Sequence, residues 1–267
     1  MMGEPATADA VARARTLPDL RVGLHIALVE ATPLSDPATL PDLVDGSGRF
    51  RTNMAAQGFR FFFKPGVRAQ LAREIRAQFE AFARTGLPLD HANCHKHFHL
   101  HPTLARLIVE IGRDYGLKAM RVPDEPPGPV RAADPASMTG GLGATALRLW
   151  TKQLRAMLRR QGLVANDQVF GLAWSGHMTE ARVAALLPHL PDGVSEIYFH
   201  PATARTPALA RTMASYDHPG ELAALLSPAV KRRMAQPGYR RTSFSDLAAE
   251  NRAAKPQAVE NRKAGAP

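Results

Sequence analysis

Short apolar runs alternate with amphipathic segments along most of the chain, and this order constrains the fold more than any other feature. The pattern predicts strands over residues 21–29, 91–101, 119–122, 169–173, 196–199 and 239–244. It predicts helices over residues 7–16, 65–83, 102–116, 146–160, 179–187 and 220–234. Strands that alternate with helices favour parallel pairing and an α/β fold, either layered or a barrel. Because the first predicted element is a helix, we expect a βα fold that lacks the strand which this helix should follow.

Residues 90–102, DHANCHKHFHLHP, contain five of the ten histidines. Within this segment the histidines alternate with mainly apolar residues, which is the period of a strand with one imidazole face. Same-face residues two positions apart stand roughly 7 Å from one another. Two neighbouring histidines can therefore share one site, but all five cannot.

Polar side chains also follow the ends of other predicted strands. The carboxyl ends of parallel strands meet at one edge of a sheet, where α/β folds place their chemistry. The residues expected at this edge are His25, His95, His97, Arg121, Ser175, His177 and His200. A single histidine at a strand end is most often structural, but histidines from neighbouring strands assemble many metal sites. His91, His189 and His218 fall away from the edge, and we expect them to be structural or exposed.

Composition limits the class of protein. At 267 residues and 45% hydrophobic, the chain can bury a full core, and we expect one domain over residues 1–249 and a disordered tail over 250–267. No apolar run is long enough to span a bilayer and residues 1–20 do not resemble a signal peptide, which predicts a cytoplasmic location. Cys94 is the only cysteine, so a metal would depend on histidine and carboxylate ligands.

The net charge of +10 fits an anionic partner or a compositional bias towards arginine. The basic residues are spread along the chain without a nucleic-acid-binding signature, so we expect no nucleic-acid partner. The segment 146–160, ALRLWTKQLRAMLRR, predicts a basic amphipathic helix. Such a helix either lies on an anionic membrane or packs its apolar stripe on the fold.

Three segments carry a family resemblance: GLHIAL at 23–28, HANCHKHFHLHP at 91–102 and SEIYFHPA at 195–202. They resemble signatures of the YdjC-like carbohydrate deacetylases, from residue 1 to about residue 248. LVDGSGRF at 43–50 and the HKHFHLHP form are most similar to the branch associated with hopanoid lipid biosynthesis. The resemblance implies an irregular (β/α) TIM-like barrel, a homodimer, and metal-dependent removal of an acetyl group from an N-acetylated sugar. The substrate it implies is an N-acetylglucosaminyl hopanoid lipid.

The resemblance also implies roles for individual residues. His25 and His95 fall on two histidine ligands of a divalent metal ion, zinc or magnesium, which would polarise the acetyl carbonyl and activate a bound water. His200 matches the histidine of a late HP motif and would protonate the departing amine or stabilise the oxyanion, and Arg121 would bind the sugar or the oxyanion. We expect the substrate to contact the side chains of His97, Ser175 and His177.

The sequence departs from the family pattern in two places. The family opens with a strand ending in Asp-Asp-Phe-Gly, which supplies an aspartate ligand, and this motif is absent here. Asn93 stands where many relatives have aspartate. Two histidines alone would hold a metal weakly, so two alternatives stay open. The chain is a metal-dependent deacetylase, which is inactive as given if the missing aspartate is essential, or it is a non-catalytic protein that binds a sugar or a lipid headgroup.

Overall fold

The computed structural model describes the backbone of residues 1–137 and 142–264 and the side chains of residues 1–137 and 147–254. It divides into two compact units, which are described separately. Unit 1 comprises Met1–Arg121, Gln153–Ala165 and Thr242–Pro267. Unit 2 comprises Val122–Lys152 and Asn166–Arg241. One domain over residues 1–249 stays a prediction.

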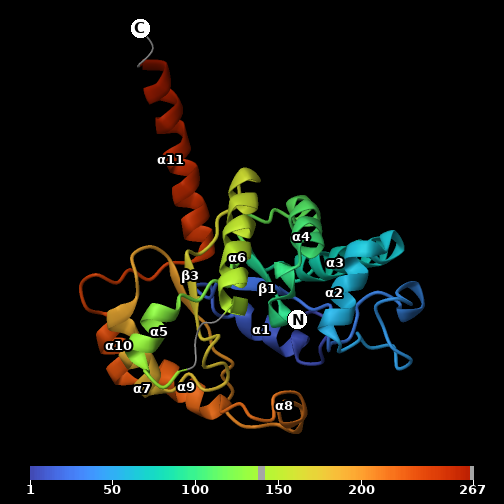
Figure 1. The fold of residues 1–267 in the computed structure, drawn as a ribbon, viewed down its shortest axis with the longest axis horizontal. Helices are drawn as coiled ribbons and strands as arrows, with labels where there is room; N and C mark the ends of the chain where they lie inside the picture. The colour runs from blue at the N-terminus through green and yellow to red at the C-terminus, as the bar shows by residue number, and fades with distance from the viewer. Residues whose placement is uncertain (138–141, 265–267) are drawn as a thin grey trace. The chain divides into compact units, whose positions relative to one another are not determined.

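A parallel pair of strands lies at the centre of unit 1 (Figure 1). β1 (Val22–Ile26) pairs with β2 (Leu89–Cys94), and the register aligns His25 with Asn93. Two isolated parallel bridges extend the pairing, Ala92 with Met120 and Ala119 with Val164. The carboxyl ends of these segments therefore lie at one edge, as the sequence predicts.

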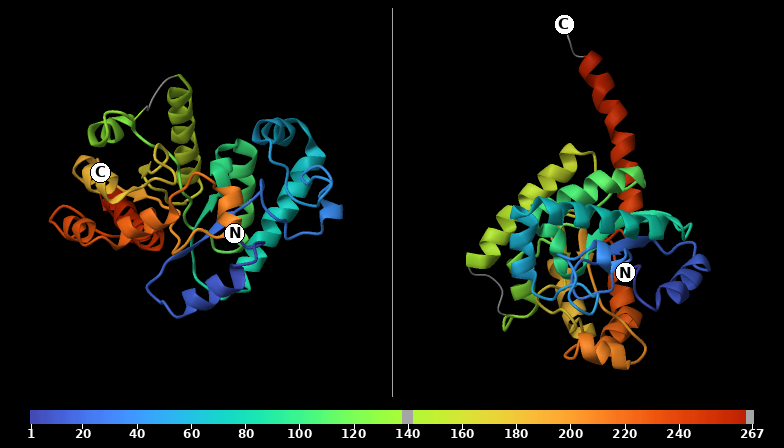
Figure 2. Two further views of the ribbon diagram at one scale, coloured as in Figure 1. Left: turned by 90° about the horizontal axis from the view of Figure 1, so that it is seen from below. Right: turned by 90° about the vertical axis from the view of Figure 1, so that its right-hand side faces the viewer.

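Helices bury their apolar faces on this sheet and on each other. α3 (Pro65–Ala83) contacts β1 and lies side by side with α4 (Pro102–Asp114) (Figure 2). The apolar residues of α3 recur at helical spacing and are buried: Val67, Leu71, Ile75, Phe79 and Phe82. Each contributes roughly 1.5–3 kcal/mol by leaving water, which is enough to fix the helix in place. The other elements wholly within unit 1 are α1 (Thr7–Arg15), η1 (Pro37–Thr39), α2 (Met54–Phe63), η2 (His95–Leu100) and α11 (Phe244–Ala264).

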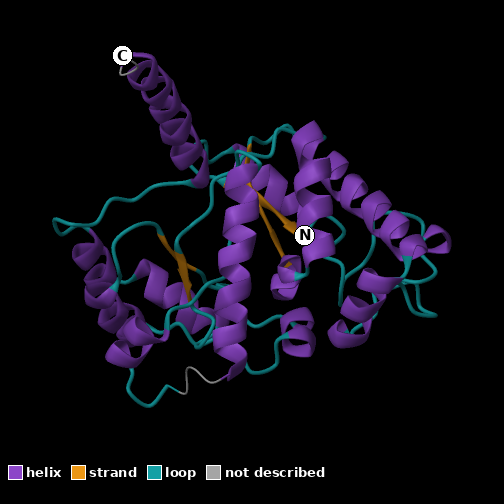
Figure 3. Cartoon of the chain, turned by 45° about the horizontal axis from the view of Figure 1, so that its top comes forward, coloured by secondary structure: helices purple, strands orange, loops and turns teal. Residues whose placement is uncertain are grey.

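Unit 2 contains a second parallel pair, β3 (Gln168–Phe170) with β4 (Ser195–Ile197), drawn in orange in Figure 3. Its buried core includes Val130, Phe170, Trp174, Met178, Val183, Leu186, Leu187, Ala224 and Val230. Its helical elements are α5 (Pro127–Ala133), α7 (Glu180–Leu186), η3 (Leu187–His189), α8 (Pro207–Thr212), α9 (His218–Leu226) and α10 (Pro228–Met234). α6 (Leu142–Arg160) contributes residues to both units.

The mixed α/β fold with parallel strand pairing is confirmed. Within the described residues, however, the sheets are two separate strand pairs with isolated bridges, and no closed barrel forms. The TIM-like barrel without its first strand is therefore not confirmed.

The strand predicted over residues 91–101 is wrong beyond Cys94. Lys96 and His97 have φ values of 51° and 54°, and the chain turns there into η2. Residues with a Cβ rarely adopt such angles, which end the extended ladder. The later histidines consequently do not share a strand face with His91.

Other segments also differ from the predictions. The sequence predicts no helix or strand between residues 122 and 146, but the structure contains α5 there, which has proline at its first turn. The helix predicted over 220–234 is interrupted at Ser227, where α10 begins with Pro228. Residues 239–243 form no strand, and α11 starts at Phe244. The disordered tail over residues 250–267 stays a prediction.

The basic segment 146–160 is helical, as predicted, and lies within α6. Leu154 and Leu158 are buried, whereas Leu147 and Leu149 are exposed. The second half of the apolar stripe therefore packs on the protein. Among the described helices, none has an apolar stretch of the length needed to cross a bilayer.

Candidate functional site

A chain of hydrogen bonds in unit 1 ends at the imidazole of His25. Asp90 Oδ2 accepts from His91 Nδ1–H at 2.9 Å, and the amide of Asn93 donates to His91 Nε2 at 3.1 Å. Asn93 Oδ1 accepts from His25 Nδ1–H at 2.5 Å. The backbone N–H of Ser245 donates to the other oxygen of Asp90 at 2.8 Å. Because every bond needs one donor, both imidazoles carry hydrogen on Nδ1, and Nε2 of His25 keeps its lone pair.

The β1–β2 pairing makes this arrangement. His25 is aligned with Asn93, and His91 lies two residues before Asn93 on the same strand face. A Cβ placed on Gly23 would lie 2.5 Å from Cε1 of His91. Glycine at this position therefore leaves the space that the His91 ring occupies.

His25 is held in its neutral form. Burial lowers the pKa of His25 to about 3, and the nearby His95 and Arg121 lower it further while the Asn93 hydrogen bond opposes them. The side chain is therefore unprotonated on Nε2 at neutral pH. A neutral imidazole is the form that binds a metal ion.

His95 lies beside His25, with ring centroids 5.7 Å apart. Its Nε2 is 3.9 Å from Oε2 of Glu30, whose other oxygen is 2.5 Å from Nζ of Lys96. Glu30 and Lys96 both have positive φ. Such backbone angles are uncommon for these residue types, and residues that adopt them are often found at functional sites. The carboxylate of Glu30 thus stands next to both His95 and Lys96.

The remaining histidines of the run point to other partners. His99 is buried and donates Nε2–H to the carbonyl oxygen of Arg121 at 2.9 Å. His101 donates Nε2–H to the carbonyl oxygen of Gly58 at 2.9 Å. The ring of His97 lies 6.2 Å from that of His99. His99 and His101 therefore stabilise backbone segments of unit 1.

Arg121 follows the segment that bridges to β2, and its backbone N–H donates to the carbonyl oxygen of Ala92 at 3.1 Å. Its positive charge lowers the pKa of both His25 and His99. Unit 1 therefore brings His25, His95 and Arg121 to the same strand edge.

A second polar cluster lies in unit 2. Ser175 Oγ and the hydroxyl of Tyr216 are hydrogen-bonded at 2.8 Å. The Tyr216 ring lies 5.1 Å from the His200 ring and 5.7 Å from the His218 ring. His218 is buried and donates Nδ1–H to the carbonyl oxygen of His200 at 2.5 Å. These contacts hold Ser175 and His200 in one cluster.

Two carboxylates position the loops around this cluster, one buried (Glu221) and one half-buried (Glu125). Glu221 accepts hydrogen bonds from the backbone N–H groups of His200 and Met178. Glu125 accepts from the N–H groups of three successive residues, 171–173, directly after β3. Burial raises the pKa of Glu125, and these three hydrogen bonds act in the opposite direction. The side chain of His177 is exposed, so the structure does not gather it with Ser175 and His200.

The donor set fits a metal ion only in part. His25 offers an oriented, neutral imidazole with a free lone pair, and His95 stands beside it. In the part of the chain that the structure describes, no three or more His, Cys, Asp or Glu side chains are grouped to hold a metal. The described residues at this strand edge thus offer two imidazole side chains and no complete set of metal ligands.

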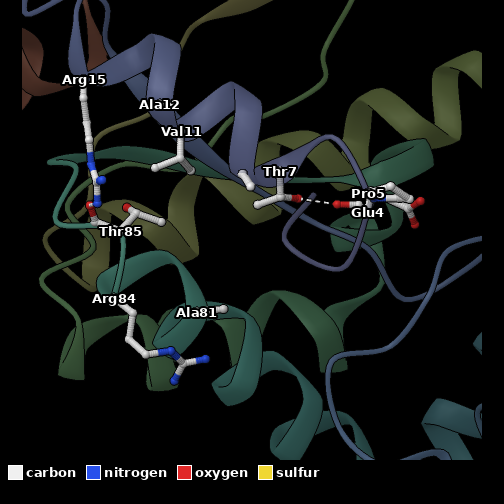
Figure 4. Close-up of a pocket in the computed structure, with 10 residues that line it drawn as sticks. Glu4, Pro5, Thr7, Val11, Ala12, Arg15, Ala81, Arg84 and Thr85 are labelled. Atoms are coloured by element: carbon white, nitrogen blue, oxygen red, sulfur yellow. Dashed lines mark hydrogen bonds between the residues drawn. The ribbon is translucent and has the colours of Figure 1, made fainter.

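A hollow between α1 and the end of α3 contains none of the predicted site residues (Figure 4). Thr7 Oγ1 donates to the carbonyl oxygen of Glu4 at 2.7 Å, and Arg15 donates to that of Thr85 at 2.7 Å. These polar groups are satisfied locally, and we assign no chemistry to the hollow.

Several residues of the two clusters were not predicted from the sequence: Glu30, Asp90, Glu125, Tyr216 and Glu221. Asp90 and Glu30 had a usable signal, because each adjoins a predicted strand that carries a candidate histidine. The two residues from α9 and the loop before it had none, since their partners lie far away in the sequence.

Curated relatives are similar over different shares of the chain. A carbohydrate deacetylase from Geobacillus stearothermophilus is 27% identical over 249 residues, which is 92% of this chain and 84% of the relative. Carbohydrate deacetylases from Brevibacillus brevis and Vibrio cholerae are 34% and 37% identical over 106 and 117 residues. The first alignment covers 40% of the Brevibacillus protein, and the second covers 43% of the Vibrio protein.

A crystal structure from Enterococcus faecalis, described as a "putative cellobiose-phosphate cleavage protein", has a similar fold. The TM-score is 0.68 at 20% sequence identity, and the match covers 92% of this chain and 85% of that one. At this identity the likeness concerns the fold alone. A family model described as YdjC-like protein matches residues 1–236. Because this match spans most of the chain and includes the strand-end histidines, we conclude that the chain belongs to the YdjC-like protein family.

Proposed function

We propose that this protein removes the acetyl group from an N-acetylated sugar. The observation that carries the proposal is the orientation of His25, whose Nδ1–H is bound by Asn93 and whose Nε2 lone pair lies at the strand edge beside His95. The names of the relatives, carbohydrate deacetylases, support this class of reaction.

In the proposed reaction a divalent ion, zinc or magnesium, is held by His25 and His95. When bound, it supplies Lewis-acid polarisation of the acetyl carbonyl and of a water molecule. Asn93 keeps the His25 ring in place, and Arg121 provides a fixed positive charge for the sugar or for the developing oxyanion.

Other candidate residues have roles of their own in the proposal. His200 protonates the departing amine or stabilises the oxyanion, and His97, Ser175 and His177 contact the sugar. The hydrogen bond between Ser175 and Tyr216 holds the serine hydroxyl in one position for such a contact.

The proposed substrate is an N-acetylglucosaminyl hopanoid lipid. The resemblance of residues 43–50 and 95–102 to the hopanoid-associated branch supports this choice. In the proposal the protein is a cytoplasmic dimer that works at the inner face of the membrane, where such a lipid is anchored.

A second candidate function is non-catalytic binding of a sugar or lipid headgroup. It is favoured by the finding that no group of three metal-binding side chains forms among the described residues. Binding of this kind needs no metal, so metal content separates the two functions.

The test measures acetate release by the purified chain with added zinc or magnesium. The substrates are an N-acetylglucosaminyl hopanoid and a soluble N-acetylglucosamine oligosaccharide. We expect release from the lipid-linked sugar, loss in His25→Ala, and no loss in His189→Ala, which changes an exposed histidine outside both clusters. Metal-independent sugar binding without acetate release, equal in His25→Ala, would establish the second function and reject the first.

A further inference from the structure

Three phenylalanine side chains at the end of α2 are exposed to solvent. Phe59 and Phe63 are each 67% exposed and Phe62 is 45% exposed, while Phe61 between them is fully buried. We call Phe59, Phe62 and Phe63 the aromatic corner. Single exposed apolar residues are common, but a contiguous cluster of this kind marks an interaction surface.

The aromatic corner has a defined shape. Phe59 and Phe63 rings lie 4.6 Å apart, and the Phe62 ring lies 4.5 Å from the ring of His101. Arg68 donates to the carbonyl oxygen of Phe62 at 2.6 Å, directly across the α2–α3 turn. Lys64 forms this turn, since it ends α2 and precedes Pro65 at the start of α3. The side chains are thus held outwards by local packing.

The surrounding sequence is strongly cationic. Residues 46–73 contain six lysines and arginines and no aspartate or glutamate. Lys64 and Arg68, which flank the aromatic corner, are exposed. Arg60 differs from these two residues, because its guanidinium forms an ion pair with Asp42 at 2.6 Å. An apolar tip flanked by the exposed cations of Lys64 and Arg68 complements a surface that is apolar inside and anionic outside.

We propose that the aromatic corner inserts into the surface of an anionic lipid bilayer. The phenylalanine rings enter the boundary between headgroups and acyl chains, while Lys64 and Arg68 bind the anionic headgroups. A second copy of the chain is a poorer occupant, because a two-fold interface would bring the same cations face to face. Leu154 and Leu158 of α6 are buried, so that helix cannot offer its whole apolar stripe to lipid.

The inference stands on exposure and charge and does not depend on the proposed reaction. It is tested by sedimentation of the full chain with phosphatidylcholine vesicles, with and without phosphatidylglycerol. We expect binding to the anionic vesicles that weakens about a hundredfold in Phe59→Ser/Phe63→Ser, since two largely exposed rings no longer leave water. Lys64→Gln should weaken binding roughly fivefold at low salt. At high salt the effect of this substitution should be smaller, because salt screens the charge.

The matched control is Leu226→Ser, which removes a leucine that is exposed on α9. It should bind as the wild type does. If the double variant has an altered melting temperature, the single variant Phe63→Ser replaces it. We expect its binding to the anionic vesicles to weaken about tenfold. Equal binding by wild type and both phenylalanine variants, or no binding by the wild type, would overturn the proposal. A wild-type dimer that Phe59→Ser/Phe63→Ser converts to a monomer would also overturn it, because a second copy would then cover the corner.

Discussion

Asn93 accepts the Nδ1–H of His25 at 2.5 Å, and the same side chain donates its amide hydrogen to His91. A carboxylate at this position could accept from His25 but has no hydrogen to give to Nε2 of His91. The amide therefore joins two imidazoles and Asp90 into one chain of hydrogen bonds. Asn93 therefore fixes the orientation of His25 and also links it to His91, which an aspartate at this position would not do.

Replacing Asn93 with leucine should release the His25 ring. Loss of a hydrogen-bonded partner behind a metal-binding imidazole typically weakens metal affinity 10–100-fold, and we expect a loss in this range. Asn93→Asp is the matched control and should keep most of the affinity, because the carboxylate still accepts from Nδ1. Zinc titration calorimetry measures the affinity, and the nitrogen shifts of the imidazole report the tautomer without metal. Unchanged affinity and tautomer in Asn93→Leu would contradict the role of this hydrogen bond.

Gly23→Ala should disturb the same chain from the other strand. The added Cβ would meet the His91 ring, and overpacking of this kind costs about 1–3 kcal/mol. In a His91→Ala background the ring is absent, so the additional cost of Gly23→Ala should largely disappear. Urea denaturation of the four proteins in this cycle measures the coupling. Additive effects of the two substitutions would show that the His91 ring does not occupy that space.

The sequence predicted the part of the site that depends on strand ends. Apolar periodicity located β1 and β2, and parallel pairing then placed His25 next to Asn93 and His95. The same rule failed after Cys94, because alternation continues through His101 although the backbone turns at Lys96 and His97. Nothing in the side-chain pattern marks the positive φ values at these two residues.

The partners that fix the site were harder to predict for a physical reason. Glu221 and Tyr216 reach Met178 and Ser175 across about forty residues of sequence, and such contacts leave no periodic signal. His218, which was expected to be structural or exposed, has the structural role: it is buried, with its Nδ1–H bound to the His200 carbonyl. A connection that is polar in sequence can be buried when a neighbouring carbonyl accepts its hydrogen bond.

His99 should make the protein less stable in mild acid. Burial lowers the pKa of His99 to about 3, whereas the unfolded chain binds a proton near 6.5. The stabilising contribution of the neutral folded form is therefore complete above pH 6.5 and is lost as the pH falls towards 3. At pH 5 the loss is about 2 kcal/mol.

The matched variant is His99→Gln, whose amide can still donate to the Arg121 carbonyl but does not titrate. The difference in unfolding free energy between pH 7 and pH 5 should be about 2 kcal/mol smaller in this variant than in the wild type. Other acid-sensitive groups, His25 among them, affect both proteins equally. The same pH dependence in the two proteins would show that His99 does not titrate differently on folding.

Gly176→Ala should damage the second cluster through Tyr216. Gly176 has φ +81°, and a Cβ there would overlap the Tyr216 ring, whose hydroxyl is bonded to Ser175. Gly238→Ala is the matched control in the same unit, since Gly238 has φ +101° and open space around the Cβ position. Both variants incur a left-handed backbone cost of about 1–2 kcal/mol, and Gly176→Ala should lose about 1–3 kcal/mol more through the ring.

Thermal and urea unfolding measure the difference, and Tyr216→Ala combined with Gly176→Ala should remove the additional loss because the ring is gone. Equal destabilisation by Gly176→Ala and Gly238→Ala would mean that the Tyr216 ring can move aside without cost. The hydrogen bond between Tyr216 and Ser175 would then not be fixed by the fold.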